Sequence, residues 1–69
     1  MEIYQKTIDV ISEREREVLD LISNEYSTKE IASALYISYD TVKTHRKNLY
    51  TKLGVSSQAQ LFALILRRP

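Results

Sequence analysis

No cysteine occurs among the 69 residues of this sequence, which has one glycine, one proline and one histidine. Without cysteine the chain has no disulfide and no thiolate metal site. A single glycine cannot form the glycine-rich loop that holds phosphate groups in nucleotide-binding enzymes. No apolar run approaches the roughly 18 residues of a membrane span, and the first residues lack the apolar segment of a signal peptide. We therefore expect a cytoplasmic protein with no membrane, metal or cofactor.

The sequence also lacks a set of residues suited to catalysis. His45 is predicted to project toward the buried side of its helix, without a carboxylate and a nucleophile grouped around it. Three glutamates, at positions 13, 15 and 17, alternate around a predicted helix N-terminus, where they cap the helix and favour its dipole. We expect no enzymatic activity.

The charges are unevenly distributed along the chain, although the formal net charge is only +1. Residues 1–37 carry four basic and eight acidic side chains, a net charge of −4. Residues 38–69 carry six basic side chains against one acidic side chain, a net charge of +5. This polarity gives one end of the domain a positive field suited to phosphate.

The chain divides into a short N-terminal segment and one small domain. Residues 1–11 are rich in β-branched side chains without helical periodicity, so they are interpreted as an extended lead-in or linker that packs Ile8, Val10 or Ile11 against the core. Residues 12–69 form the domain. Its first helix starts at the capping box of residues 12–15 and is expected to end near residues 23–24.

Two helices joined by a tight turn are predicted in the middle of the chain. Residues 27–30 form a second capping box, and the helix that follows ends at residues 36–37. Ser38 caps a third helix, which ends at Gly54, in the position that favours a left-handed C-terminal cap. A short helix packed against a longer basic helix is the arrangement that reads the DNA major groove.

The third helix has one apolar and one polar face. At about 100° per residue, Val42, Leu49 and Leu53 fall together and are predicted to face the core. The opposite face has no large hydrophobic residue, and it is formed by Asp40, Thr44, Lys47, Asn48 and Thr51, with Lys43 on its flank. All of these except Asp40 can donate hydrogen bonds, as DNA recognition requires.

The fourth helix is predicted to start at a serine–glutamine capping box, residues 57–60, and it is apolar around about 260° of its circumference. A surface helix on a three-helix core needs one apolar stripe a little over roughly 100° wide. The surplus is interpreted as a symmetric dimer surface that includes Leu61, Phe62, Leu64 and Ile65. The alternative is that residues 1–11 fold over this helix.

Several stretches, in this order and spacing, resemble the LuxR/GerE-type helix-turn-helix domain of bacterial response regulators and quorum-sensing regulators. They are ISEREREVL at residues 11–19, STKEIA at 27–32, IS-x-x-TVK-x-H at 37–45, Y-x-KLGV at 50–55 and QL at 60–61. The resemblance covers residues 11–66. It implies an all-α, four-helix helix-turn-helix bundle whose third helix enters the major groove and whose fourth helix dimerises.

The resemblance also implies which side chains contact DNA. Carried over by position, the base-edge contacts are Lys43, Thr44 and Lys47. The implied phosphate contacts are Ser38 and Thr41 at the start of the third helix and Thr28 and Lys29 on the second. From the helical positions we add Asn48, on the edge of the groove face, and Arg46, whose stem can pack beside the core while its guanidinium reaches a phosphate.

One departure from the family concerns the end of the first helix. The family usually has a glycine where this chain has Glu25. We therefore expect Asn24 to take the left-handed conformation in its place.

The leading hypothesis is a sequence-specific, double-stranded DNA-binding domain of a bacterial transcription regulator. The expected partners are an inverted-repeat operator and a second copy of the chain, which pairs in solution or only on DNA. RNA polymerase is a further candidate partner.

One alternative is a promoter-reading domain like that of a sigma factor, which shares the Arg-Glu-Arg-Glu-Val-Leu opening; the apolar fourth helix argues against it. Another is a protein-interaction module with the same fold, against which Lys43 and Lys47 argue. Both a free-standing regulator and a domain of a larger one are compatible with the sequence.

Overall fold

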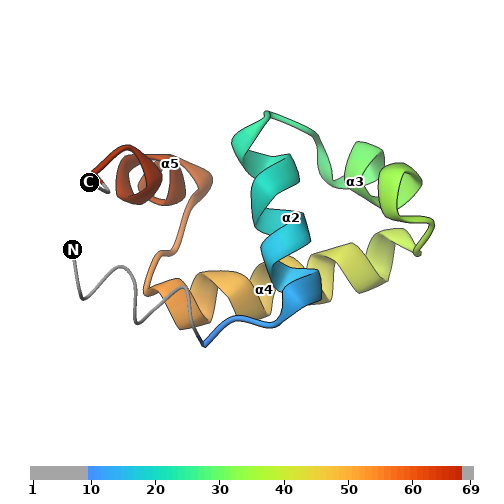
Figure 1. Ribbon diagram of the computed structural model, residues 1–69, viewed down its shortest axis with the longest axis horizontal. Helices are drawn as coiled ribbons and strands as arrows, with labels where there is room; N and C mark the ends of the chain where they lie inside the picture. Colours follow the sequence, from blue (N-terminus) through green and yellow to red (C-terminus); the bar gives the residue numbers. More distant parts are fainter. Residues whose placement is uncertain (1–9, 68–69) are drawn as a thin grey trace.

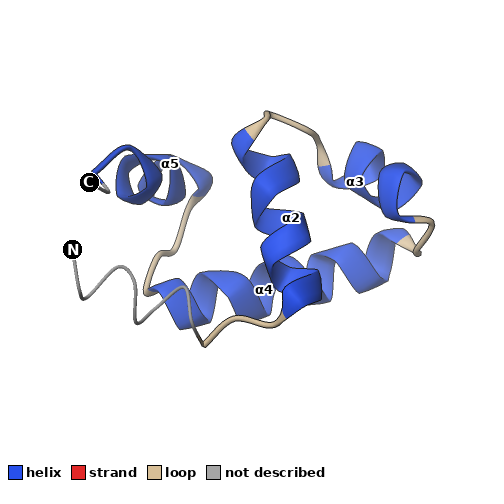
Figure 2. Cartoon of the chain, viewed as in Figure 1, coloured by secondary structure: helices blue, strands red, loops and turns tan. Residues whose placement is uncertain are grey.

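The computed structural model describes residues 10–67, which form four helices joined by loops (Figures 1 and 2). The helices are α2 (Glu13–Ser23), α3 (Thr28–Leu35), α4 (Tyr39–Leu53) and α5 (Gln58–Arg67). This part of the chain contains no strand. The predicted all-α, four-helix class is confirmed, and so are the predicted ends of the first three helices.

Each helix begins after a serine whose hydroxyl accepts a backbone N–H from the first turn. The residues are Ser12, Ser27, Ser38 and Ser57, with N···O distances of 3.1 Å in all four cases. The capping boxes of α2 and α3 are complete, because Glu15 and Glu30 also accept the N–H of their serine. These bonds satisfy amides that the helix itself leaves unpaired.

The capping box predicted for α5 is only half correct. Ser57 Oγ does accept the Gln60 N–H, but Gln60 Oε1 accepts from Ser56, not from Ser57. Ser56 offers two donors to that oxygen, its backbone N–H at 2.7 Å and its hydroxyl at 2.9 Å. The glutamine therefore reaches one residue further back than the motif predicts.

The C-terminal ends of α2, α3 and α4 share one hydrogen-bonding motif around a left-handed residue. Glu25, Tyr36 and Gly54 have φ values of 66°, 59° and 71°. In each case the residue after the left-handed one bonds back to the fifth carbonyl before it, as in Tyr26 N to Leu21 O at 3.0 Å. The expectation that Asn24 would be left-handed is wrong: Asn24 has φ −92°, and the next residue makes the reversal.

The helices pack around one apolar core. In Figure 1, α4 runs along the long axis, α2 crosses it near the middle, and α3 and α5 lie toward opposite ends. The fully buried side chains come from all four helices: Val18, Ile22, Ile31, Val42, Leu49 and Leu61. The apolar face predicted for α4 is therefore confirmed, and His45 is half-buried, as its predicted position implies.

A partly buried ion pair joins the start of α2 to the end of α4. Glu15 is only 4% exposed, and its Oε1 accepts from Lys52 Nζ at 2.8 Å and from the Ser12 N–H at 2.9 Å. The hydrogen bond from Lys52, followed by that from Ser12, lowers the pKa of Glu15 although burial opposes the shift. Lys52 thereby fixes α4 to α2 by a polar contact in addition to the core.

The predicted lead-in lies mostly outside the described residues, and Ile8 is among the residues not described. Val10 is 60% exposed, whereas Ile11 is half-buried and packs against the core. Between residues 10 and 67, no helix is both long enough and apolar enough to cross a membrane.

Candidate nucleic-acid interface

One side of α4 carries an uninterrupted polar and basic surface. The side chains of Lys43, Thr44, Lys47 and Asn48 are all exposed, on the face opposite buried Val42 and Leu49. Within residues 10–67, neither lysine lies within salt-bridge distance of a carboxylate. Their charges are therefore available to an anionic partner. The structure thus exposes together Thr44, Lys47 and Asn48, which the sequence placed on this face, and Lys43, which it placed on the flank. Asp40 and Thr51, predicted for the same face, are exposed as well.

The hydroxyl groups at the start of α4 are already ordered by local hydrogen bonds. Ser38 Oγ and Thr41 Oγ1 are 2.8 Å apart, and both residues are exposed. Thr44 is also exposed, and its Oγ1 donates to the backbone carbonyl of Asp40 at 3.2 Å. Ser38 and Thr41 lie next to unpaired amides of the α4 N-terminus, where an anion is favoured.

Arg46 is held by residues from three helices, which the sequence did not indicate. Its guanidinium donates to Thr28 Oγ1 at 3.2 Å, to the Tyr50 hydroxyl at 2.8 Å and, at 3.4 Å, to Gln58 Oε1. It also lies 5.6 Å from the centroid of the Tyr50 ring. All three hydrogen-bond partners are neutral, so its positive charge is not compensated by them. Arg46 thus does not extend freely outward as its predicted phosphate contact assumed.

Thr28 and Lys29 occupy the first turn of α3, beside the edge of the α4 face. Lys29 is exposed, whereas Thr28 is half-buried and its hydroxyl accepts the hydrogen bond from Arg46. The two residues predicted to contact phosphate from α3 therefore differ in accessibility.

The exposed apolar surface of α5 differs from the predicted dimer surface. Leu61 is fully buried in the core of the single chain, so it is not accessible to a second copy. Phe62, Leu64 and Ile65 are half-buried, and Leu66, which the sequence did not single out for this surface, is 84% exposed. The helical positions showed that α5 has more apolar surface than the core needs, but they did not show which part of this surface the core covers.

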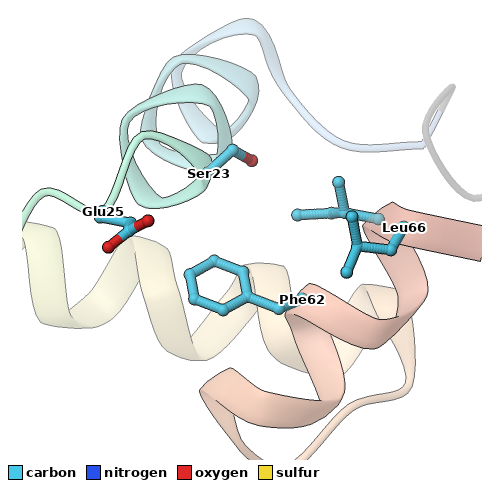
Figure 3. A pocket seen from close by; sticks show the side chains of 5 residues that line it. Ser23, Glu25, Phe62 and Leu66 are labelled. Carbon is cyan, nitrogen blue, oxygen red and sulfur yellow. The ribbon is translucent and has the colours of Figure 1, made fainter.

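A shallow groove of about 240 Å³ separates α5 from the end of α2 (Figure 3). It is lined by Phe62, Ile65 and Leu66 on α5 and by Ser23 and Glu25 on the other side. In Figure 3 the Phe62 ring and the Leu66 side chain both point into this space. The groove is thus apolar on one wall and polar on the other.

No metal-binding group of three or more histidine, cysteine, aspartate or glutamate residues occurs in the described part of the chain.

A short helix, α3, and a longer helix, α4, are joined by a tight turn, and the second has a basic exposed face. Together they define a helix-turn-helix DNA-binding domain. Residues 9–65 match the family described as "Bacterial regulatory proteins, luxR family". The chain belongs to this family, which consists of DNA-binding regulators and is not an enzyme family.

Relatives in curated proteins and in solved structures agree with this assignment. The oxygen regulatory protein NreC of Staphylococcus aureus strain JH9 is 41% identical over 59 residues, and NreC of strain NCTC 8325 / PS 47 gives the same value. The structure of the response regulator StyR matches with a TM-score of 0.91 and 34% identity over 97% of this chain. The matched regions are 27% of NreC and 34% of the StyR chain, so the chain spans about a third or less of these proteins.

Proposed function

We propose that the chain binds double-stranded DNA in a sequence-specific manner as the output domain of a bacterial transcription regulator, acting in the cytoplasm. The observation that carries the proposal is the exposed α4 face, on which Lys43, Thr44, Lys47 and Asn48 lie together without a carboxylate partner among the described residues. With α4 in the major groove, the lysines and Thr44 reach base edges. Ser38, Thr41, Lys29 and Asn48 meet the flanking phosphates.

Arg46 and Thr28 contribute to the proposed interface as one unit. Because they are hydrogen-bonded to each other, a phosphate at this position would be met by a guanidinium whose direction is already fixed. A preordered side chain loses less conformational entropy when it binds. We place this unit at the edge of the interface, on the DNA backbone.

The second part of the proposal is a dimer through α5. Phe62, Leu64 and Ile65 remain partly accessible, and Leu66 beside them is 84% exposed. Two copies related by a two-fold axis would bind an inverted repeat whose half-sites lie about one DNA turn apart. In a longer protein, other segments would then supply the input signal.

Selection from a randomised duplex library tests the proposal, followed by fluorescence anisotropy on the enriched site. An enriched inverted repeat supports a dimeric major-groove reader. If no sequence is enriched and only weak binding remains, specific DNA recognition by this chain is contradicted.

Replacing Lys47 by alanine gives the sharpest test of the recognition face. We expect Lys47→Ala to weaken binding to the enriched site by about 1–3 kcal/mol and to relax the preference at one base pair. Arg16→Ala is the matched control, since Arg16 is an exposed cation on α2, outside this face. Unchanged binding by Lys47→Ala would show that the face is assigned wrongly.

A further inference from the structure

One flank of α4 carries two cations between two aromatic rings, in the order Tyr39, Lys43, Arg46 and Tyr50. Lys43 Nζ lies 5.8 Å from the centroid of the Tyr39 ring, and the Arg46 guanidinium lies 5.6 Å from that of Tyr50. Each pair is four residues apart, a spacing that places side chains next to each other on a helix. Both distances are within the range of cation–π interactions.

Tyr39 has no other evident role in the fold. It is 52% exposed, it is the first residue of α4, and its neighbour Ser38 already caps the helix. Tyr50, in contrast, also hydrogen-bonds Arg46, which is tied to α3 and α5. The Tyr39–Lys43 pair is therefore the one whose purpose the packing does not explain.

The ring of Tyr39 restricts the directions that the Lys43 ammonium can take. A lysine side chain free in solvent loses much rotamer freedom when it binds, and this loss weakens the complex. A cation held over a ring before binding has lost part of that freedom already. Lys47 lies one turn further along α4 and has no such aromatic contact within the described residues.

We propose that Tyr39 is a positioning residue for Lys43. Its ring holds the ammonium at the N-terminal end of the recognition face, so that Lys43 distinguishes one base pair from another more sharply than an unrestrained lysine would. Tyr39 acts through Lys43 and makes no specific contact with DNA itself. This inference rests on the proposed DNA-binding function and adds a residue that determines its specificity.

A double-mutant cycle tests the proposal, using the whole chain and the inverted-repeat duplex enriched by selection. The proteins are the wild type, Tyr39→Leu, Lys43→Ala and the double variant. We expect Tyr39→Leu to weaken binding about two- to five-fold, the size of an exposed cation–π interaction. In the Lys43→Ala background the same change is expected to have no effect. Binding to a scrambled duplex is also expected to stay unchanged, so that the specificity ratio falls.

Aromatic replacements separate the ring from the hydroxyl and from the fold. Tyr39→Phe and Tyr39→Trp retain a ring and are expected to bind as the wild type does, with Trp at least as tight. Circular dichroism and the thermal midpoint confirm that all variants fold, as expected for a residue that is half exposed.

Three results would overturn the inference while leaving the proposed function intact. If Tyr39→Leu reduced the affinity equally in the wild type and in the Lys43→Ala variant, the ring would act independently of Lys43. If Tyr39→Phe reduced the affinity as much as Tyr39→Leu does, the hydroxyl would contact DNA directly. Tighter binding by Tyr39→Leu would show that the ring holds Lys43 away from DNA. Absence of any enriched duplex for the wild type would instead contradict the proposed function itself.

Discussion

Glu15 combines a local and a long-range role in a single carboxylate. It closes the capping box of α2 with Ser12, and it accepts a hydrogen bond from Lys52 at the far end of α4. The carboxylate is almost fully buried, whereas the Lys52 side chain is 38% exposed. When the carboxylate is removed, water can still solvate the lysine. The loss of stability is therefore smaller than for a fully buried pair.

We expect Glu15→Gln to lower the free energy of unfolding by about 1–2 kcal/mol at neutral pH, because the ion pair and its charge-assisted hydrogen bond are lost. Urea unfolding measures the change. Glu17→Gln is the control: its partner Arg14 lies 3.0 Å away, but both side chains are nearly half exposed. Exposed pairs of this kind are worth at most about 1 kcal/mol, and many contribute nothing. Equal effects of the two variants would contradict the stabilising role of the Glu15–Lys52 pair.

The same pair predicts a pH dependence of stability. The folded-state pKa of Glu15 is below its ordinary value of 4.5, so the folded protein binds this proton less readily than the unfolded chain. The stabilisation is complete above the unfolded pKa and is lost as the pH falls through the lowered folded pKa. The free energies of unfolding of the wild type and Glu15→Gln should therefore converge as the pH falls below about 4. A difference that stays constant there would argue against this origin.

At the scale of the helix, the C-terminal ends of α2 and α3 contain residues in an unfavourable backbone conformation. Glu25 and Tyr36 both have positive φ, which costs a residue with a side chain about 1–2 kcal/mol. The motif needs a left-handed residue to turn the chain away from the helix and to satisfy its last carbonyls. At Gly54 the same motif is free of this cost.

Glu25→Gly is expected to raise the free energy of unfolding by about 0.5–1 kcal/mol, since relief of the left-handed strain exceeds the added freedom of the unfolded chain. Asn24→Gly is the matched control, because Asn24 has a negative φ and gains no relief. Thermal or urea unfolding compares the two. If Asn24→Gly stabilised the protein and Glu25→Gly did not, the strain would have been assigned to the wrong residue.

For α5, a charge on the exposed apolar surface tests the dimer. Leu66→Glu is expected to abolish cooperative binding to the inverted repeat while affinity for a single half-site remains, because a carboxylate would be buried between the copies. Titrations of full-site and half-site duplexes give the ratio of affinities. Tyr36→Glu changes a 94% exposed residue that ends α3, the helix that lies toward the opposite end of the molecule from α5 (Figure 1), and it should leave that ratio unchanged. Equal ratios for the wild type and Leu66→Glu would argue against a dimer through this surface.

The whole molecule has opposite charges on its two sequence halves, −4 for residues 1–37 and +5 for residues 38–69, although the total is +1. Affinity for DNA should therefore depend on salt far more than the net charge suggests. We expect the logarithm of the binding constant to fall linearly with the logarithm of salt concentration, with a slope of about −0.9 for each phosphate contacted. Anisotropy titrations at several salt concentrations measure the slope. A slope near zero would exclude phosphate as the main source of affinity.

The sequence predicted those features that depend on residues close together in the chain. Serine specifies where each helix starts, and the periodic apolar residues of α4 specify its buried face, without reference to the rest of the fold. The partners of Arg46 were not predictable in this way, because Thr28 and Gln58 are 18 and 12 residues away and meet it only after packing. Likewise, the sequence could not decide which apolar side of α5 the core would cover, and Leu61 was assigned to the surface in error.

The four serine caps have a consequence for the rate of folding. Each cap joins residues only three positions apart, so every helix boundary can form before the helices meet. Small helical domains whose contacts are mostly local fold in roughly microseconds to milliseconds. We therefore expect this chain to refold quickly after transient unfolding, and to spend little time with its apolar core exposed to aggregation.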